Sequence, residues 1–316
     1  MDPVIVVGAG ISGIAAAREL RDAGLPVVVL DRGRRIGGRM ASRTIDGRPV
    51  DIGASYFTAS DPAFTALAED WQQRGLAHPW TDTFQLREGD ETSTKAGPMR
   101  WGTPGGLRSL VEDLAAGLDV RSQTVTQIGP GPTVDGQPAA AVLLAMPDPQ
   151  ARRLLGPVHQ TEADQLTAAY EPVLALTASW PERAWADLDG MFVHDDRIVS
   201  WVADDGRRRG DAAPVLVAHS TTDWANQHLS APESATAAMV AALRRLLEIP
   251  SEPLRASVHR WTFAKPSGPR DEPFYLSDGL IGACGDGWGG KPRVEGAFGS
   301  GQALGRAVAS ALGTRR

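Results

Sequence analysis

The sequence has a single cysteine, Cys284, among its 316 residues. One cysteine cannot form a disulfide within the chain, and this composition is typical of a reducing compartment. No uninterrupted apolar run reaches the length of a membrane-spanning helix. The N-terminus lacks the basic start of a secretory signal, because Asp2 stands there and glycines interrupt the apolar run. We therefore expect a cytoplasmic protein without a membrane partner.

An excess of positive charge and the common hydrolase motifs are also missing. The formal net charge is −6 and the pI is about 5.6, so a nucleic-acid partner is not expected. Lysine is rare, with three residues (Lys95, Lys265 and Lys291) against 29 arginines. The chain has no H-E-x-x-H, C-x-x-C or G-x-S-x-G sequence, which argues against metal-dependent hydrolysis and serine-hydrolase chemistry.

The first 31 residues carry the most specific pattern in the chain. Residues 4–7, VIVV, form a β-branched run of the kind that a buried parallel strand uses. Gly8, Gly10 and Gly13 follow with the G-x-G-x-x-G spacing. The first glycine allows a tight turn, the second lets the backbone approach a pyrophosphate, and the third lets a helix pack close to the sheet. The spacing therefore predicts a phosphate-binding turn.

The elements after this turn complete the pattern. Residues 14–20, IAAAREL, predict a helix whose N-terminal amides and dipole suit a phosphate group. Residues 27–30 predict a second strand, and Asp31 ends it about 20 residues beyond the glycines, where a carboxylate can bind ribose hydroxyls. Strand, glycines, helix, strand and acid in this order favour an adenine dinucleotide site over a glycine turn in an ordinary βαβ unit.

A glycine pair between basic residues follows Asp31 in the stretch DRGRRIGGRM. Gly37 and Gly38 allow the backbone to come near a ligand, and Arg35 and Arg39 can reach phosphate or ribose. The alternative is a solvated basic turn. The position directly after the second strand favours a role in the dinucleotide site.

The C-terminal part of the chain repeats the N-terminal order of a strand, a glycine-rich turn and a helix. Residues 280–283 predict a strand leading into GDGWGG, where Asp286 is a natural partner for sugar hydroxyls. A final helix beginning near Ala297 would direct its amides and positive dipole end at whatever lies there. The N- and C-terminal stretches are therefore expected to build one domain.

The middle of the chain has a different pattern. Strand-like runs at residues 173–180, 198–203, 215–219 and 257–263 alternate with charged loops, and one amphipathic helix covers residues 233–249. This pattern predicts an α+β substrate domain on an antiparallel sheet, inserted into an α/β, Rossmann-like domain. The expected boundaries are 1–74, 99–150 and 274–316 for the nucleotide domain, and 75–98 and 151–273 for the substrate domain.

Shorter stretches give local predictions. Short strands are expected around Val120 and Val125, and residues 128–138, IGPGPTVDGQP, are typical of a hairpin tip. Residues 75–98 are polar and turn-rich and predict no clear element. The run Arg207–Arg209 in a glycine-bounded loop is interpreted as a solvated turn instead of an anion site.

Several of these motifs together resemble a known family. VIVVGAGISG with IGGRM, and the terminal GDGW and RVEGAFGSG, are similar to the two flavin motifs of the amine-oxidase superfamily of FAD-dependent oxidoreductases. DIGASYFT, the WVA that begins at Trp201, His219 five residues before Trp224, and the HRW that begins at His259 resemble renalase and its bacterial relatives. The motifs occur in the same order and span nearly the whole chain.

The resemblance implies non-covalently bound FAD. Trp288 is then a candidate wall of the flavin site, while Cys284 is interpreted as a small buried hydrophobe instead of a covalent flavin link. The positions of this chain that are expected to contact FAD are Gly8, Gly10, Gly13, Asp31, Arg32, Gly38, Arg39, Val125, Asp286, Val294, Glu295, Ala297 and Phe298.

The resemblance also implies an activity. Relatives of this type oxidise dihydropyridine isomers of NADH or NADPH, with a hydride passing to flavin N5 and oxygen then giving hydrogen peroxide. Two residues depart from the family pattern, because Ser55 stands where relatives usually carry glutamine and Asp205 where they carry asparagine. Both positions belong to motifs expected to face the substrate, so the substrate is the point that these departures leave open.

Candidate catalytic residues come from the same motifs. Tyr56 and Trp201 can stack on a planar ring bound against the flavin, with ordinary core packing as the alternative. His219 can donate to a carboxamide or a phosphate, or it is a core histidine with satisfied hydrogen bonds. His259 and Arg260 are adjacent on a strand and face opposite sides, so only one of them, Arg260 or its neighbour, can face the pocket.

Two other functions remain in view. One is a flavin amine or small-metabolite oxidase on the same fold, although Lys265, in a loop-like stretch, is a poor match for the lysine that amine oxidases commonly place near the flavin. The other is a flavin-binding protein without turnover. The expected partners are a small-molecule substrate and oxygen, no metal is expected, and the chain is expected to be a monomer or a homodimer.

Overall fold

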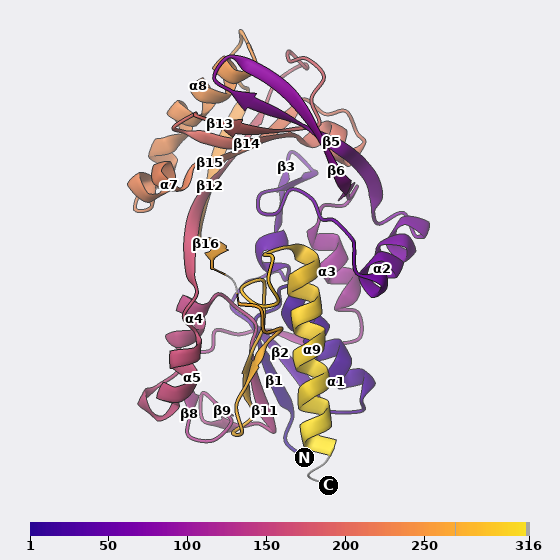
Figure 1. The fold of residues 1–316 in the computed structure, drawn as a ribbon, viewed down its shortest axis with the longest axis vertical. Helices are drawn as coiled ribbons and strands as arrows, with labels where there is room; N and C mark the ends of the chain where they lie inside the picture. The colour runs from indigo at the N-terminus through magenta and orange to yellow at the C-terminus, as the bar shows by residue number, and fades with distance from the viewer. Residues whose placement is uncertain (269, 314–316) are drawn as a thin grey trace. The chain divides into compact units, whose positions relative to one another are not determined.

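The computed structural model describes residues 1–268 and 270–313, and the chain forms two compact units. Unit 1 comprises Met1–Met40, Leu110–Tyr170 and Lys265–Arg316, and unit 2 comprises Ala41–Ser109 and Glu171–Ala264. The chain crosses from one unit to the other four times, so both units are assembled from segments that are far apart in the sequence. Figure 1 shows the ribbon coloured along the chain.

Unit 1 is built on a six-stranded sheet in the order β17-β18-β11-β1-β2-β7. The five strands from β18 to β7 are parallel, and only β17 pairs in the antiparallel sense. The strands are β1 (Val4–Val7), β2 (Val27–Asp31), β7 (Asp119–Ser122), β11 (Ala141–Leu144), β17 (Tyr275–Leu276) and β18 (Ile281–Ala283). The predicted Rossmann-like architecture, with β18 supplied by the C-terminal stretch, is confirmed.

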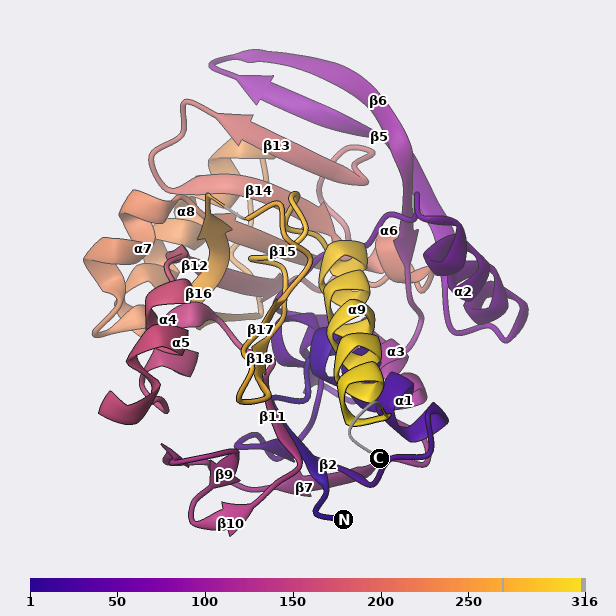
Figure 2. The same cartoon turned by 60° about the horizontal axis from the view of Figure 1, so that its bottom comes forward.

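The helices of unit 1 include the two that carry the flavin motifs. They are α1 (Ile11–Asp22), η1 (Gly38–Met40), α4 (Asp148–Arg152), η2 (Pro157–His159), α5 (Gln160–Gln165) and α9 (Val294–Gly313), while α3 (Arg108–Leu114) begins in unit 2 and continues into unit 1. Figures 1 and 2 show α9 lying alongside α1. The contact is close because a Cβ atom at Gly301 or Gly305 would overlap the backbone of Ser12 or Ala16.

The expected hairpin tip is a small antiparallel sheet of β8 (Ile128–Gly129), β9 (Thr133–Val134) and β10 (Gln137–Pro138). Asp135 and Gly136 form its second turn, and both have positive φ. The strand expected near Val120 is β7, but Val125 lies outside any strand. Its side chain is buried instead in the hydrophobic core of unit 1.

Unit 2 is built on a seven-stranded sheet in the order β16-β12-β15-β14-β13-β5-β6. The pairs β12–β15 and β15–β14 are antiparallel as predicted, and the unpredicted pairs β14–β13 and β5–β6 are antiparallel too, whereas β13 and β5 pair in parallel. The strands are β5 (His78–Glu88), β6 (Glu91–Gly102), β12 (Ala169–Ser179), β13 (Gly190–His194), β14 (Val199–Asp204), β15 (Val215–Ser220) and β16 (Arg255–Ser267). The sheet is therefore mixed.

Smaller elements complete unit 2. The strands β3 (Ser42–Ile45) and β4 (Arg48–Asp51) form a two-stranded ribbon that turns at Asp46-Gly47, where both residues have positive φ. The helices are α2 (Pro62–Gln73), α6 (Asp205–Arg209), α7 (Thr222–His228), η3 (Pro232–Ala235) and α8 (Thr236–Leu246).

The two faces of the unit 2 sheet have different partners. Leu216 and Ala218 of β15 lie on the face that packs in one hydrophobic cluster with α8. Side chains alternate along a strand, so Val215, Val217 and His219 lie on the opposite face, where the first two pack against Val50 of β4. The ribbon β3–β4 and the segment that follows it therefore cover this second face.

The polar stretch at residues 75–98, which predicted no element, belongs to the longest hairpin of the protein, β5–β6. Figure 2 shows it as two long curved strands. Most of β6 is exposed, and its polar composition reflects an edge strand bordered by solvent on both faces. An exposed strand lacks the apolar alternation that identifies strands in a sequence, which explains why it was not predicted.

The compact units divide the chain differently from the expected boundaries. Residues 41–74 and 99–109 belong to unit 2, and residues 151–170 and 265–273 belong to unit 1. The physical reason for the first difference is that the β3–β4 ribbon packs on β15, which is part of the unit 2 sheet. The expected segment 274–316 ends in residues 314–316, which lie outside the described part of the chain.

Candidate functional site

The glycine turn of unit 1 has the geometry that its spacing predicts. Gly8 has φ of +110°, which strains any other residue. A Cβ atom at Gly13 would overlap the Gly8 carbonyl oxygen, so the third glycine is what allows α1 to pack against the turn. Gly10 is the N-cap of α1 and provides no side-chain cap, and a Cβ atom there would meet no atom within 4 Å. The first amides of α1 therefore face open space.

Asp31 ends β2 beside this turn. Its carboxylate accepts hydrogen bonds from the Ala9 amide at 2.7 Å and from the Gly33 amide at 2.6 Å. The side chain is thereby fixed at the carboxyl end of β2, next to the glycine turn. A carboxylate at this place can also accept hydrogen bonds from ribose hydroxyls, as the sequence predicts.

The basic glycine stretch folds over the same turn. The Gly37 amide donates to the Ala9 carbonyl at 2.9 Å, and a Cβ atom at Gly38 would lie 3.2 Å from Gly10 Cα. This close approach, together with φ values of +121° and +52°, explains the glycine pair. In contrast, the side chain of Arg32 is exposed to solvent.

Arg39 joins the N-terminal and C-terminal motifs. Its guanidinium donates to both carboxylate oxygens of Asp286, at 2.7 and 2.6 Å, and lies 5.6 Å from the centre of the Tyr170 ring. Burial lowers the pKa of Arg39, but the charge of Asp286, the hydrogen bond to it and the nearby Tyr170 together outweigh burial, and the pKa is raised overall. Arg39 and Asp286, which are both predicted to contact FAD, thus hold each other in place.

The final helix begins earlier than the sequence predicts. Helix α9 starts at Val294, and the amide of Ala297 already donates to the Arg293 carbonyl at 3.0 Å. The amide of Ala297 is therefore inside the helix, and the amides that can face a ligand belong to residues 294–296. Glu295 lies in this first turn, and the side chain of Phe298 is buried.

Trp288 and Cys284 lie in the interior of unit 1. The Arg270 guanidinium lies 3.6 Å from the centre of the Trp288 ring, and Arg270 is bound in turn by Asp148. Cys284 is 1% exposed, and burial raises the pKa of its thiol to about 12. A thiol in this state is a poor nucleophile, in agreement with its interpretation as a small buried hydrophobe.

These residues fit an adenine dinucleotide cofactor. The uncapped amides of α1 suit a diphosphate, and the open space at Gly10 leaves room for it. Asp31 provides a carboxylate acceptor, and the Arg39–Asp286 pair provides donors and acceptors next to the start of α9. The position also agrees with the fold, because β1 lies where the crossovers of the sheet change direction. Unit 1 is therefore a dinucleotide-binding domain.

The motif residues of unit 2 converge on residues 52–55. The indole of Trp201 donates to Ser55 Oγ at 3.0 Å, and Arg208 donates to the Ser55 carbonyl at 2.7 Å. The indole of Trp261 donates to the Ile52 carbonyl at 2.6 Å, and the ring of His219 hydrogen-bonds to the Gly53 backbone. Side chains from β14, α6, β16 and β15 thus hold one short segment.

The next two residues point in opposite directions. The ring of Tyr56 lies 5.2 Å from Phe84 and 5.9 Å from Trp201, between ring centres. Phe57 is buried instead in a second aromatic cluster, where its ring stacks on Trp101. Tyr56 and Trp201, both predicted, therefore meet on the sheet, and we call the group of Tyr56, Trp80, Phe84, Phe192 and Trp201 the aromatic face.

His219 is held in the neutral form. Burial, with the positive charge of Arg208, lowers the pKa of His219 to about 4 against the opposing hydrogen bond to Gly53. Its Nε2 atom is buried and has no hydrogen-bond partner among residues 1–268 and 270–313. The hydrogen bond to the Gly53 backbone raises the pKa of His219, so the ring is the donor in it. In the neutral ring Nδ1 therefore carries the hydrogen, and Nε2 is an acceptor. The expectation that His219 donates is corrected.

Asp205 does not have the environment that the sequence suggests. It is fully buried and forms ion pairs with Arg48, Arg208 and Arg209. Burial raises its pKa, but the three arginines outweigh this and hold the pKa well below its ordinary value. The carboxylate is therefore a compensated charge in the interior of unit 2, and the expectation that Asp205 faces the substrate is wrong.

The Arg207–Arg209 run is a helix, not a solvated turn. Helix α6 is capped by Asp204, and Arg208 and Arg209 are 1% and 5% exposed. Their partner Asp205 lies three and four residues before them, the spacing at which helix side chains meet. Attention to this spacing in DDGRRR would have indicated the buried network, including Arg208, which the sequence reasoning missed.

The structure decides between His259 and Arg260. His259 packs on Trp261, with ring centres 4.6 Å apart, and its pKa is lowered to about 4 by burial and by Arg43 and Arg260. Arg260 is exposed on the other side of β16 and donates to the Leu229 carbonyl. Arg260 thus lies on the side of β16 opposite Trp261, whose indole binds the Ile52 carbonyl. Lys265 lies within β16, not in a loop, and is exposed.

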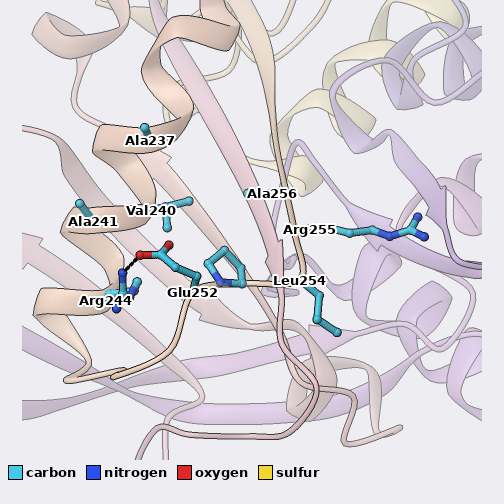
Figure 3. A pocket seen from close by; sticks show the side chains of 9 residues that line it. Ala237, Val240, Ala241, Arg244, Glu252, Leu254, Arg255 and Ala256 are labelled. Atoms are coloured by element: carbon cyan, nitrogen blue, oxygen red, sulfur yellow. Dashed lines mark hydrogen bonds and ion pairs between the residues drawn. The ribbon is translucent and has the colours of Figure 1, made fainter.

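A pocket of about 310 Å³ lies elsewhere in unit 2, between α8 and the start of β16 (Figure 3). Its lining includes Ala237, Ala241 and an ion pair between Arg244 and Glu252. None of the predicted site residues lines it. In residues 1–268 and 270–313, no group of histidine, cysteine or acidic side chains is arranged to hold a metal ion, and no helix is long and apolar enough to cross a membrane.

Comparisons with known proteins agree with this fold. A family model for NAD(P)-binding Rossmann-like domains matches residues 6–71, and a model for flavin containing amine oxidoreductases matches residues 72–304. The chain therefore belongs to the family of flavin-containing amine oxidoreductases, whose members are FAD-dependent. FAD is the dinucleotide that the unit 1 residues fit.

Individual relatives match in sequence over short segments. The chain is 43% identical over 82 residues to the putative flavin-containing monoamine oxidase AofH of Mycobacterium tuberculosis, covering 26% of this chain and 17% of that protein. It is 42% identical over 67 residues to putrescine oxidase of Kocuria rosea, covering 21% and 14%. These matches span less than a fifth of the relatives' lengths.

Solved structures match over the whole chain. Cyclohexylamine oxidase from Brevibacterium oxydans has a TM-score of 0.77 at 16% identity, with 99% of each chain covered. A putative protoporphyrinogen oxidase from Exiguobacterium has a TM-score of 0.73 at 14% identity, with 100% of this chain and 99% of that chain covered. At these identities the likeness concerns the fold.

Proposed function

We propose that the chain is an FAD-dependent oxidase of renalase type, which oxidises dihydropyridine isomers of NADH or NADPH and passes the electrons to oxygen, giving hydrogen peroxide. FAD, when bound, supplies the hydride acceptor. The chain would bind FAD through the glycine turn, Asp31, Arg39 and Asp286. Phe84 and Trp201 are buried, so the partly exposed rings of the aromatic face, Tyr56 and Trp80, would receive the flat ring of the substrate.

The proposal rests on the charge state of the histidines and carboxylates around residues 52–55. Three histidines of unit 2 have lowered pKa values, each through burial and a nearby arginine: His78 with Arg209, His219 with Arg208, and His259 with Arg43 and Arg260. The acids of the buried network, Asp51 and Asp205, are paired with arginines. None of these five groups offers an unpaired negative charge to an ammonium ion, which supports a substrate whose reacting ring is neutral.

His219 gives the ring a specific partner. With Nδ1 donating to Gly53, the buried Nε2 atom can accept a hydrogen bond from the carboxamide of a nicotinamide ring. When a dihydropyridine gives up a hydride, its ring becomes an aromatic cation and no proton has to leave it, so the substrate needs no general base. His219 therefore binds and orients the substrate and is not required as a base.

Amine oxidation is the second candidate, and the family match favours it. The matching relatives include proteins named monoamine oxidase and putrescine oxidase. However, the lysine that amine oxidases commonly place beside the flavin has no good positional match in this chain, since Lys265 lies within β16 directly before Pro266. Amine oxidation would therefore have to proceed without it.

Turnover with oxygen separates the two candidates. The protein, loaded with FAD, is supplied with isomeric dihydropyridine dinucleotides or with primary amines at equal concentration, and oxygen uptake and hydrogen peroxide are measured. We expect turnover with a dihydropyridine isomer and only background uptake with amines. Turnover with amines alone would contradict the proposal.

Substitution of His219 tests the site. His219→Ala loses one buried hydrogen bond to the substrate, on the order of 1 kcal/mol, and should raise KM about fivefold with a smaller change in kcat. His194→Ala is the matched control, because His194 lies exposed on β13. Equal KM values in the two variants would place His219 outside the substrate site.

A further inference from the structure

Arg208 connects the buried charge network of unit 2 to residues 52–55. Its side chain is 1% exposed, and its guanidinium donates to the Ser55 carbonyl at 2.7 Å and to Asp205. It also lies 3.7 Å from an oxygen of Asp51, the residue that precedes the segment. The side chain of Trp201 binds the same serine through Oγ. Arg208 of α6 thus binds the carbonyl of Ser55, and Trp201 of β14 binds its hydroxyl.

The backbone of Arg208 is fixed as well. Its carbonyl accepts a hydrogen bond from the ring of His78 at 3.0 Å, and it lies so close to Gly102 that a Cβ atom there would overlap it. Helix α6 is short, but its N-cap, Asp204, is itself buried and accepts from the indole of Trp185 at 2.7 Å. Arg208 therefore projects from a rigid base.

Arg209 belongs to the same network but has different neighbours. It donates to the Thr103 carbonyl at 2.9 Å and to Asp51 at 3.0 Å, and it also binds Asp205. The hydrogen bonds of its guanidinium thus go to Asp51, Asp205 and the backbone of residues 103 and 104. The two arginines thus contribute the same charge to the same carboxylates, while Arg208 alone of the pair reaches Ser55.

We propose that Arg208 is the positioning residue of the substrate site: by holding the Ser55 carbonyl, it fixes the segment Ile52–Tyr56 against β14 and β15, so that Tyr56 joins the aromatic face and Gly53 receives the ring of His219. This inference rests on the proposed function for the identity of the substrate. The placement of the segment itself depends only on contacts within unit 2.

Hydrogen exchange tests this placement without any substrate. Deuterium uptake of a peptide covering residues 53–57 is compared in wild type, Arg208→Met and Arg209→Met. Each variant removes one arginine, and Asp205 keeps Arg48 and the other arginine. Loss of the charge-assisted hydrogen bond to the Ser55 carbonyl should speed exchange of this peptide about tenfold in Arg208→Met and several-fold less in Arg209→Met. Equal uptake in the two variants would overturn the proposal.

Kinetics give the second readout. Arg208→Met should raise KM for the dihydropyridine at least about tenfold with FAD content unchanged, and Arg208→Lys, which keeps the charge and one donor, should recover part of it. Arg209→Met, which keeps the hydrogen bond to the Ser55 carbonyl, should raise KM several-fold less than Arg208→Met. A rise in KM that is the same in both Met variants, or no recovery with lysine, would contradict the role. If wild type oxidises no dihydropyridine, the proposed function fails, and the exchange result still decides the role of Arg208.

Discussion

The role of Asp205 depends on its burial and on its arginine partners. An isolated carboxylate beside a substrate would select against anions, but three arginines compensate this one inside unit 2. A buried carboxylate is stable only when it is paired in this way, because desolvation of a lone charge costs several kcal/mol. Replacing Asp205 by asparagine would therefore leave arginines unpaired in the interior, and would not adjust the substrate site directly.

Asp31 carries a prediction of its own. Asp31→Ala removes the acceptor for the Ala9 and Gly33 amides and the proposed acceptor for the ribose hydroxyls, a loss of about 1.5–3 kcal/mol for each charge-assisted bond. The affinity for FAD should fall at least about tenfold, as measured by titrating the apoprotein with FAD and following flavin fluorescence. Asp22→Ala is the control, because Asp22 is exposed at the end of α1. Equal affinities would remove Asp31 from the cofactor site.

The roles of some single residues can be predicted from the sequence, and the roles of others cannot. Gly8, Gly10, Gly13 and Asp31 were predicted because a short backbone motif determines both their identity and their position. Arg208 was not, because its role depends on a carbonyl 153 residues away in the sequence. Contacts of this kind arise only when the sheet of unit 2 brings the segments together.

At the scale of elements, α9 and α1 offer a matched pair of substitutions. A Cβ atom at Gly301 would overlap the backbone of Ser12, whereas one at Gly299 meets no atom within 4 Å. Gly301→Ala should therefore lower the free energy of unfolding by about 1–3 kcal/mol through overpacking. Gly299→Ala should raise it by about 0.5–1 kcal/mol, because alanine favours the helix.

Urea unfolding of the two variants checks this prediction. The control is built in, since both substitutions add one methyl group to the same helix. Equal effects on the free energy of unfolding would mean that α9 does not pack on α1 through Gly301.

Most elements followed from periodicity, and the exceptions share a cause. The buried strands β1, β11 and β15 and the helix α8 have apolar patterns that identify them. The hairpin β5–β6 lacks such a pattern because much of it is exposed. The start of α9 was misplaced by three residues because no side-chain cap marks it in the sequence.

At the scale of the whole molecule, the chain crosses between two units four times. Two of the crossings lie within the long strands β12 and β16, and a third lies within α3. Glycine- or proline-rich linkers, the usual sequence signal of a boundary, are therefore missing at these points. The two-domain architecture could be predicted from the change of pattern along the chain, but its boundaries could not.

The proposed oxidation of a dihydropyridine requires no general base. A dihydropyridine gives up a hydride and becomes an aromatic cation, with no proton to remove, whereas an amine must lose its ammonium proton. His219, whose pKa is lowered to about 4, remains neutral throughout the neutral range. Protonation of this histidine therefore adds no pH dependence above about pH 6.

Anaerobic reduction of the bound flavin tests this claim most directly. The protein is mixed with an isomeric dihydropyridine dinucleotide, and the loss of flavin absorbance is followed from about pH 6 to about pH 9. We predict a limiting rate that varies by less than about twofold over this range, with slower or no reduction by primary amines. Reduction that is faster with an amine, and that rises about tenfold per pH unit, would contradict the account.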